Sequence, residues 1–486
     1  MQDIYLHVGC ELLEYFMDAP KTVEFSMEIL SNFEKLFKLE HSSTEFIEKT
    51  YQLILSFFYF PNSQVQRKSL DCLSLYAESF GCASIVSFFE EKCFEDADEA
   101  TTLDLLYFIQ LLLTNFKQDT PASLFKTFLF GLIESASFDV RKETIEPLVL
   151  VHTYIPDMSD EAFMLYCRLC DDPVWSVREK CTMNLAEIAA HSLQHQTIIS
   201  LCSAFLQDTS SKVKNSMMDC LGMVITYLGQ NTTPFLFDSY LDGIPIHPSK
   251  FWNPAPHRLL QSSFCFPGVL VTFANIYWQK LKPLLIFLSN HDNWKVRLPI
   301  ASSINQVLHQ IDSAEIKREL FNCFRIFIQG QGTKVKGACL ESFASSLKHF
   351  HMEDQIILVQ ELLRQDESKW RLRLITVQQM LLFPVELLEL EEVVESIDSF
   401  LKDPVYEVRS TAILLPWHIY SQTKTLQKLV VKMLIDLAIS PSFVDRITFA
   451  KSCFQFSPLP VELQVVLDSL SDDPCNEVRR VVKLHK

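Results

Sequence analysis

The sequence predicts an all-α solenoid, a stack of antiparallel helix pairs, from a recurring phrase and from its spacing. The phrase is an acidic turn followed by Val-Arg at the start of an apolar helix. Its clearest copies are Asp172–Arg178, Asp403–Arg409 and Asp473–Arg479. Its apolar position falls at 65, 140, 177, 213, 296, 335, 372, 408, 444 and 478. Most copies therefore lie about 37 residues apart, with one doubled and one stretched gap, and we expect about 12 repeats.

Each repeat is predicted to contain two helices joined by the acidic turn, as residues 160–190 illustrate. The first helix, with Phe163, Met164 and Cys167 at helical spacing, ends at Asp171-Asp172-Pro173, because proline cannot continue a helix and aspartate can cap the next one. Apolar residues of the second helix recur at steps of three and four: Val177, Cys181, Leu185 and Ile188, then Val213, Met217, Leu221, Val224 and Leu228 one repeat later. One hairpin cannot cover this stripe, so neighbouring repeats must stack.

The aspartate and the arginine of the phrase lie six residues apart in the clearest copies. A charge at the end of one helix and a charge near the start of the next can pair between adjacent repeats. We therefore expect a ladder of ion pairs along the stack. The alternative is that the same turns form one edge of the solenoid and present these side chains to a partner.

Composition and charge narrow the classes of partner that we expect for this chain. The chain has 486 residues, 48% of them hydrophobic, only 10 glycines and a net charge of −17. Proteins that bind nucleic acid need a basic surface, so we expect no nucleic acid partner. The acidic surface is typical of a large protein kept soluble by its charge.

Cysteines and hydropathy indicate the compartment. Most of the 14 cysteines fall at core-like helix positions, where a free cysteine packs as a small apolar residue: Cys181, Cys220, Cys339 and Cys453. The first residues show no secretory signal, and the longest apolar run, Leu103–Phe116, is too short to span a bilayer. We expect a cytoplasmic protein, with the nucleus as a second compartment, and no membrane partner.

Three segments are predicted: N-terminal repeats at 1–230, an insertion rich in proline and aromatic residues at 231–268, and C-terminal repeats at 269–486. The insertion carries too many aromatic residues for a flexible linker: Phe235, Phe237, Tyr240, Phe251 and Trp252. We expect an ordered loop laid against the solenoid. The alternative is an irregular repeat whose aromatic residues fill the core.

The repeat resembles HEAT repeats, and two sets of motifs sharpen the resemblance. The turns His291–Leu298, Lys369–Leu374 and Asp403–Arg409 resemble those of the protein phosphatase 2A scaffold subunit. The succession Phe251–Pro256, Phe266–Val269, Trp278 and Trp294–Arg297 resembles the protein phosphatase 4 regulatory subunit 1 family, although that family's long acidic insertion is absent here. This resemblance implies a non-catalytic regulatory or scaffold subunit. It would bind a serine/threonine phosphatase catalytic subunit, of type 4 or 2A, and direct it to protein substrates or further subunits.

Tryptophan and arginine at the turns are the candidate contacts, because these residue types anchor protein interfaces. The resemblance to the phosphatase 2A scaffold implies partner binding by Trp294, Arg297, Trp370, Arg371, Arg373 and Arg409. The same pattern adds Trp175 and Arg178, and the insertion adds Phe251 and Trp252 as further contacts. The alternative for any single tryptophan is packing between repeats.

Two other classes of protein are alternatives. Another HEAT-repeat adaptor, such as a nuclear-transport receptor, would be favoured by ordered acidic clusters on the second helices. A HEAT-built enzyme is disfavoured: deoxyhypusine hydroxylase holds iron with His-Glu dipeptides, and no histidine here precedes glutamate. Cys167, Cys170, His191 and His195 imitate a zinc module, but their spacing is too long and spans a repeat phrase. We expect no enzymatic activity, no cofactor and no metal.

Overall fold

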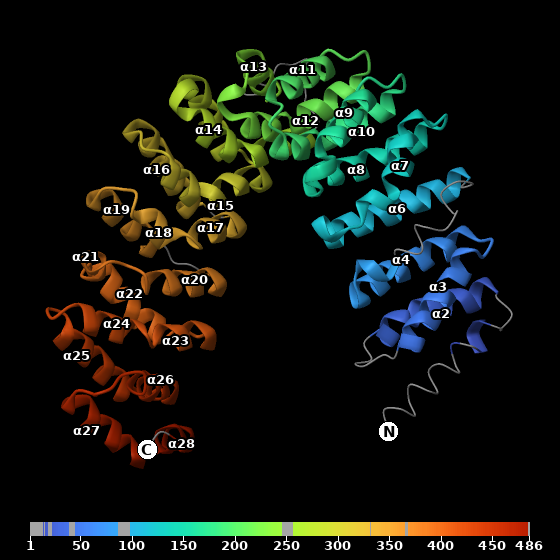
Figure 1. The fold of residues 1–486 in the computed structure, drawn as a ribbon. Coiled ribbons are helices and arrows are strands. Elements are labelled where there is room, and N and C mark those ends of the chain that lie inside the picture. Colours follow the sequence, from blue (N-terminus) through green and yellow to red (C-terminus); the bar gives the residue numbers. More distant parts are fainter. Residues whose placement is uncertain are drawn as a thin grey trace. The chain divides into compact units, whose positions relative to one another are not determined.

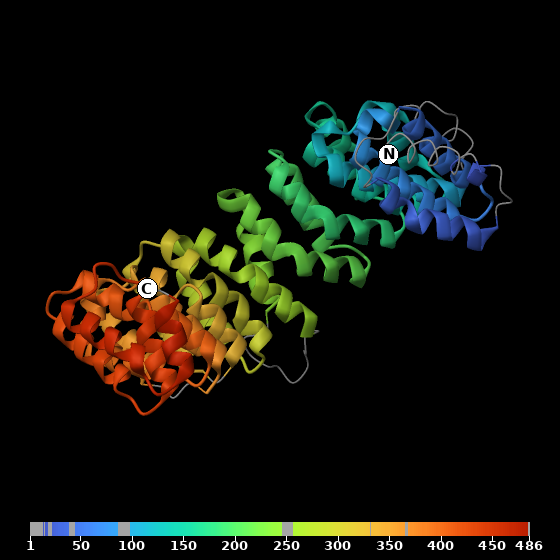
Figure 2. The same cartoon turned by 90° about the horizontal axis from the view of Figure 1, so that it is seen from below.

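A computed structural model describes residues 13, 15–17, 22–37, 44–85, 98–244, 256–330, 332–364 and 368–484. The chain divides into two units, Met1–Leu241 and Asp242–Lys486, and each is described by itself. Both views show coiled ribbons throughout these parts, and no strand occurs among the described residues (Figures 1 and 2). The all-α prediction is confirmed.

The first unit is a series of helix pairs whose second helices stack in chain order. The second helices α4, α6, α8, α10 and α12 each pack on the next one (Figure 1). The helices are α2 (Val23–Phe37), α3 (Thr44–Phe58), α4 (Ser63–Phe80), α6 (Glu99–Phe116), α7 (Ala122–Gly131), α8 (Phe138–Tyr154), α9 (Ser159–Leu169), α10 (Trp175–His191), α11 (His195–Leu206), α12 (Ser211–Leu228) and α13 (Pro234–Asp242).

The second unit repeats the arrangement with shorter helices, several of them broken within a repeat. The helices are α14 (Pro256–Ser289), α15 (Trp294–Gln310), α16 (Ala314–Gln329), α17 (Thr333–Leu340), α18 (Phe343–Leu347), α19 (Met352–Leu363), α20 (Trp370–Met380), α21 (Val385–Leu388), α22 (Glu391–Leu401), α23 (Tyr406–Ala412), α24 (Leu415–Gln422), α25 (Gln427–Ala438), α26 (Phe443–Cys453), α27 (Val461–Ser469) and α28 (Asn476–Lys483). Among its second helices, α15 packs on α17, α17 on α20, and α20 on α23.

The core stripe of the second helices is confirmed. All nine residues of the two predicted stripes in α10 and α12 are at most 1% exposed. Helix α9, the first helix of the repeat at 160–190, differs from the prediction. Its Met164 is exposed, and Tyr166 is buried in its place. The Tyr166 hydroxyl donates to the carbonyl oxygen of Cys181 at 2.7 Å, so a polar group joins the two helices inside the core.

The predicted insertion contains helical structure. Helix α13 buries Phe237 and Tyr240 while Phe235 stays exposed, as expected for the alternative in which aromatic residues fill the core. Phe251 and Trp252 lie outside the described residues. The segment boundaries at 230 and 268 remain a prediction.

Helix α14 is two helices joined at a bend. Tyr277 has non-helical backbone angles, φ −118° and ψ 27°. His257–Ser289 is long and apolar enough to cross a membrane by length and composition, but half of its most apolar window is buried against the rest of the fold. Trp278, just after the bend, is buried and donates its indole N–H to Glu315 at 2.9 Å. These contacts are those of core helices in a stacked repeat.

Candidate partner-binding ridge

The acidic turn has the same geometry in four copies of the phrase. The carboxylate accepts the backbone N–H two residues ahead: Asp172 from Val174, Asp208 from Ser210, Asp403 from Val405 and Asp473 from Cys475, at 2.7–2.8 Å. This side-chain bond holds the chain in position to enter the second helix. The residues that follow the turn therefore have a fixed place on each repeat.

The arginine of the phrase joins its own turn to the next repeat. In Arg178, Nη1 donates to the carbonyl oxygens of Asp172 at 2.7 Å and Pro173 at 3.2 Å. Its Nε and Nη2 donate to the carboxylate of Asp208, one repeat later, at 2.7 and 2.9 Å. The guanidinium thus forms a forked ion pair whose plane is held by the backbone.

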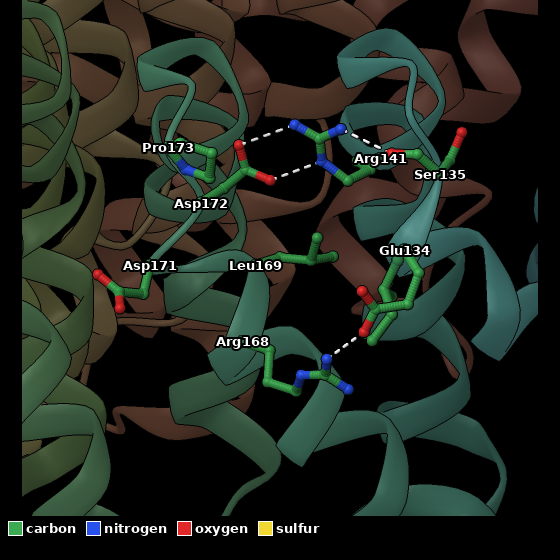
Figure 3. A pocket seen from close by; sticks show the side chains of 9 residues that line it. Glu134, Ser135, Arg141, Arg168, Leu169, Asp171, Asp172 and Pro173 are labelled. Atoms are coloured by element: carbon green, nitrogen blue, oxygen red, sulfur yellow. Dashed lines mark hydrogen bonds and ion pairs between the residues drawn. The ribbon is translucent and has the colours of Figure 1, made fainter.

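The predicted ladder of ion pairs between adjacent repeats is confirmed. Four rungs lie within the described residues, with nitrogen–oxygen distances of 2.6–2.7 Å: Arg141–Asp172, Arg178–Asp208, Arg373–Asp403 and Arg446–Asp473. The arginine side chains are 12–17% exposed and the aspartates 3–8%. Figure 3 shows the Arg141–Asp172 rung across a hollow, with the exposed pair Arg168–Glu134 below it.

Three of these rungs lower the pKa of their aspartates. Burial by itself would raise the pKa of Asp172, but hydrogen bonds from Arg141 and from the amide of Val174 outweigh it and lower the pKa. Hydrogen bonds from Arg178 and Arg446 likewise lower the pKa values of Asp208 and Asp473. The charged form of Asp172, Asp208 and Asp473 is therefore the form that the fold stabilises.

An aromatic residue stands three positions before the arginine in six of the turns. Sequence reasoning identified Trp175, Trp294 and Trp370 and missed Phe138, Tyr406 and Phe443, which alignment of the phrases on their arginine would have found. Four of the six are at least 40% exposed: Phe138, Trp175, Tyr406 and Phe443. We call these six aromatic residues, together with Arg141, Arg178, Arg297, Arg371, Arg373 and Arg409, the turn ridge.

Lysines of the following repeat lie over several of these rings. Lys212 is 4.8 Å from the ring centre of Trp175, Lys334 is 4.2 Å from that of Trp294, and Lys451 is 4.9 Å from that of Tyr406. Arg371 lies 4.6 Å from the ring of Trp370, its neighbour in the chain. Such cation–π contacts hold a ring in place while its edge stays accessible to solvent.

The arginines proposed as contacts differ in how the fold uses them. Arg178 and Arg373 belong to ladder rungs, so their forks are engaged within the chain. Arg371 is exposed. Among the described residues, no carboxylate forms an ion pair with Arg297 or Arg409, although each donates to carbonyl oxygens of its own turn. Of these five arginines, Arg178 and Arg373 are therefore the two engaged in ladder rungs.

The described residues contain no group of three or more histidine, cysteine, aspartate or glutamate side chains arranged to hold a metal ion. Burial raises the pKa of Cys167 to about 12, and burial raises that of Cys170 well above the ordinary value. Zinc binds thiolates, so these surroundings disfavour the zinc module imitated by the sequence.

Comparison with known proteins identifies the fold. No family model and no curated protein matches the chain. Among solved structures, the Kap95:Nup1 complex has a TM-score of 0.60 at 12% identity, and the alignment covers 96% of this chain and 65% of that one. Yeast importin-β (Kap95p) has a TM-score of 0.54 at 10% identity, covering 96% and 70%. An importin-β crystal structure has a TM-score of 0.51 at 11% identity, covering 89% and 60%.

These similarities define the class of protein. The chain is an all-α HEAT-repeat solenoid, as predicted, and shares this fold with importin-β-type transport receptors. It spans about three fifths of the length of the importin-β chain that it matches. At such low identity the likeness is one of fold, and the resemblance to the phosphatase 4 family remains a prediction.

Proposed function

We propose that this chain is a non-catalytic adaptor that binds proteins along its turn ridge. The observation that carries the proposal is the repeated placement of an aromatic ring and an arginine at the same point of six turns, two in the first unit and four in the second. Large rigid rings and forked cations are the residue types that contribute most to protein interfaces. Turn bonds already hold Arg178, Arg297, Arg373 and Arg409, and lysines lie over the rings of Trp175, Trp294 and Tyr406, so little conformational entropy is lost there when a partner binds.

The first partner class is a serine/threonine phosphatase catalytic subunit of type 4 or 2A. The turn motifs at Trp294–Arg297 and Lys369–Leu374 support this choice by their resemblance to phosphatase scaffolds. The chain would position the partner's active site toward protein substrates or further subunits and would contribute no catalytic residue. It would act in the cytoplasm and in the nucleus.

The second candidate is a nuclear-transport receptor, and the fold comparison favours it over the phosphatase. The solved structures with TM-scores of 0.51–0.60 are importin-β-type receptors, one of them in a complex with Nup1. In that case the turn ridge would bind transport cargo or nucleoporin segments. Both candidates place protein binding on the repeats.

Affinity capture with the full chain, followed by mass spectrometry, distinguishes the two. Recovery of a phosphatase catalytic subunit supports the first class, and recovery of nucleoporins or import cargo supports the second. Arg371→Ala and Trp175→Ala, each at an exposed ridge residue, should reduce recovery. The matched control is Arg318→Ala, which removes an exposed arginine from α16, the first helix of its repeat. Recovery unaffected by either ridge variant would place the interface elsewhere.

A further inference from the structure

At Arg409 the ladder lacks its carboxylate although the turn around it is intact. Arg409 donates through Nη1 to the carbonyl oxygen of Asp403, as the rung arginines do to their own turns. The residue of the next repeat that corresponds to the rung aspartates is Ser440. Its hydroxyl accepts the N–H of Ser442 at 3.2 Å and donates to Asp445 at 2.7 Å. Ser440 therefore keeps the turn bond but offers Arg409 no charge.

A hollow of about 260 Å³ opens beside Arg409, between the second helices α23 and α26. Its cations are Arg409 and Lys451, and none of the residues that line it is acidic. The rings of Tyr406 and Phe443, which are 56% and 47% exposed, form part of its wall. The hollow thus combines positive charge with apolar surface, on a chain whose net charge is −17.

We propose that this hollow binds a short protein segment with an aspartate or glutamate next to an apolar side chain. The partner's carboxylate accepts from Nε and Nη2 of Arg409, as the carboxylate of Asp403 accepts from those of Arg373 at 2.6 and 3.0 Å. The apolar neighbour packs against Tyr406 and Phe443. The proposal rests on the adaptor function above and assigns the chemistry of one contact within it.

Charge complementarity and preorganisation support this occupant. The four filled rungs show that an arginine held in this way forms a forked pair with a carboxylate. At Arg409 the backbone bond already fixes the guanidinium, so binding loses less side-chain entropy than at a free arginine. Lys451, 4.9 Å from the ring of Tyr406, adds a second cation at the same hollow.

The test uses an array of immobilised heptapeptides, each with a central aspartate beside leucine or phenylalanine. In the matched peptides, asparagine or phosphoserine replaces the aspartate. The full chain should bind the aspartate peptides at least about tenfold more strongly than the asparagine peptides, since a hydrogen bond to a charged group contributes about 1.5–3 kcal/mol. Arg409→Gln should abolish this preference, and Lys451→Gln should weaken it. Arg479→Gln is the matched control, because Arg479 makes the same backbone bond in the last repeat.

A second variant keeps the test independent of damage to the fold. Ser440→Asp supplies a carboxylate within the chain, so it should pair with Arg409 and abolish peptide binding. Ser440→Asn keeps a turn bond without charge and should leave peptide binding intact. Equal binding of aspartate and asparagine peptides, preference for phosphoserine, or undiminished binding by Ser440→Asp would overturn the proposal.

The same variant separates this inference from the proposed function. If Ser440→Asp no longer binds the peptides and the wild-type chain captures a phosphatase or a nucleoporin, the hollow and the adaptor function both stand. If the wild-type chain captures such a partner but shows no preference for carboxylate peptides, only the inference about the hollow fails. If peptide binding holds and no protein partner is captured, the proposed partner classes fail.

Discussion

The two ion pairs beside the hollow in Figure 3 allow the ladder to be tested against a matched exposed contact. Asp172→Ala removes the carboxylate of a rung whose arginine and aspartate side chains are 13% and 5% exposed. Glu134→Ala removes the carboxylate that pairs with Arg168, where both side chains are more than 60% exposed. The variants change the same kind of contact in the same place and differ in burial.

The structure sets the expected magnitudes. Breaking a buried pair by removing one partner costs about 3–5 kcal/mol, because the other charge is left buried. Arg141 keeps its bonds to the carbonyl oxygens of Ser135 and Ala136, so we expect the low end, about 3 kcal/mol. Exposed ion pairs contribute about 0–1 kcal/mol, so Glu134→Ala should change stability little.

Native-state hydrogen exchange of the amides in α8 and α10 is the appropriate assay, because a repeat array can open locally. A loss of about 3 kcal/mol should speed exchange there about a hundredfold in Asp172→Ala, and by at most about fivefold in Glu134→Ala. Asp172→Asn, which can keep the turn bond to Val174, should fall between them. Similar protection in the two alanine variants would refute the structural role of the ladder.

Three further outcomes follow from the same contacts. Because the pKa of Asp208 is lowered in the folded state, its rung stabilises the protein above an ordinary pKa of 3.8, and this contribution is lost as the pH falls through the lowered value. The difference in urea midpoint between wild type and Asp208→Asn should therefore be largest near pH 7 and shrink in acid. Arg373→Ala should lower the melting temperature by about 6 °C, whereas Arg371→Ala, at an exposed position, should leave it unchanged. Iodoacetamide should label Cys475 in the native protein and spare Cys202, whose pKa burial raises to about 12; labelling of both would contradict the packing.

Much of the ridge was predictable from the sequence, and the errors have identifiable causes. Spacing predicted the turn, the buried stripe and the ladder, because helical period and the place of proline and aspartate are local properties. The same spacing predicted that Met164 lies on the apolar face, whereas Tyr166 occupies the core. An amphipathic helix allows several apolar faces, and only the neighbouring helix selects one of them.

Sequence alone determined that this protein is a stack of helix pairs, since a period of about 37 residues repeats the signals that start and end each helix. Only the tertiary structure decided which arginines form ion pairs within the chain. That choice depends on the residue that the next repeat places opposite each one: Asp208 opposite Arg178, but Ser440 at the matching place for Arg409. A forked ion pair forms only where the carboxylate comes within hydrogen-bond distance, and stacking sets that distance.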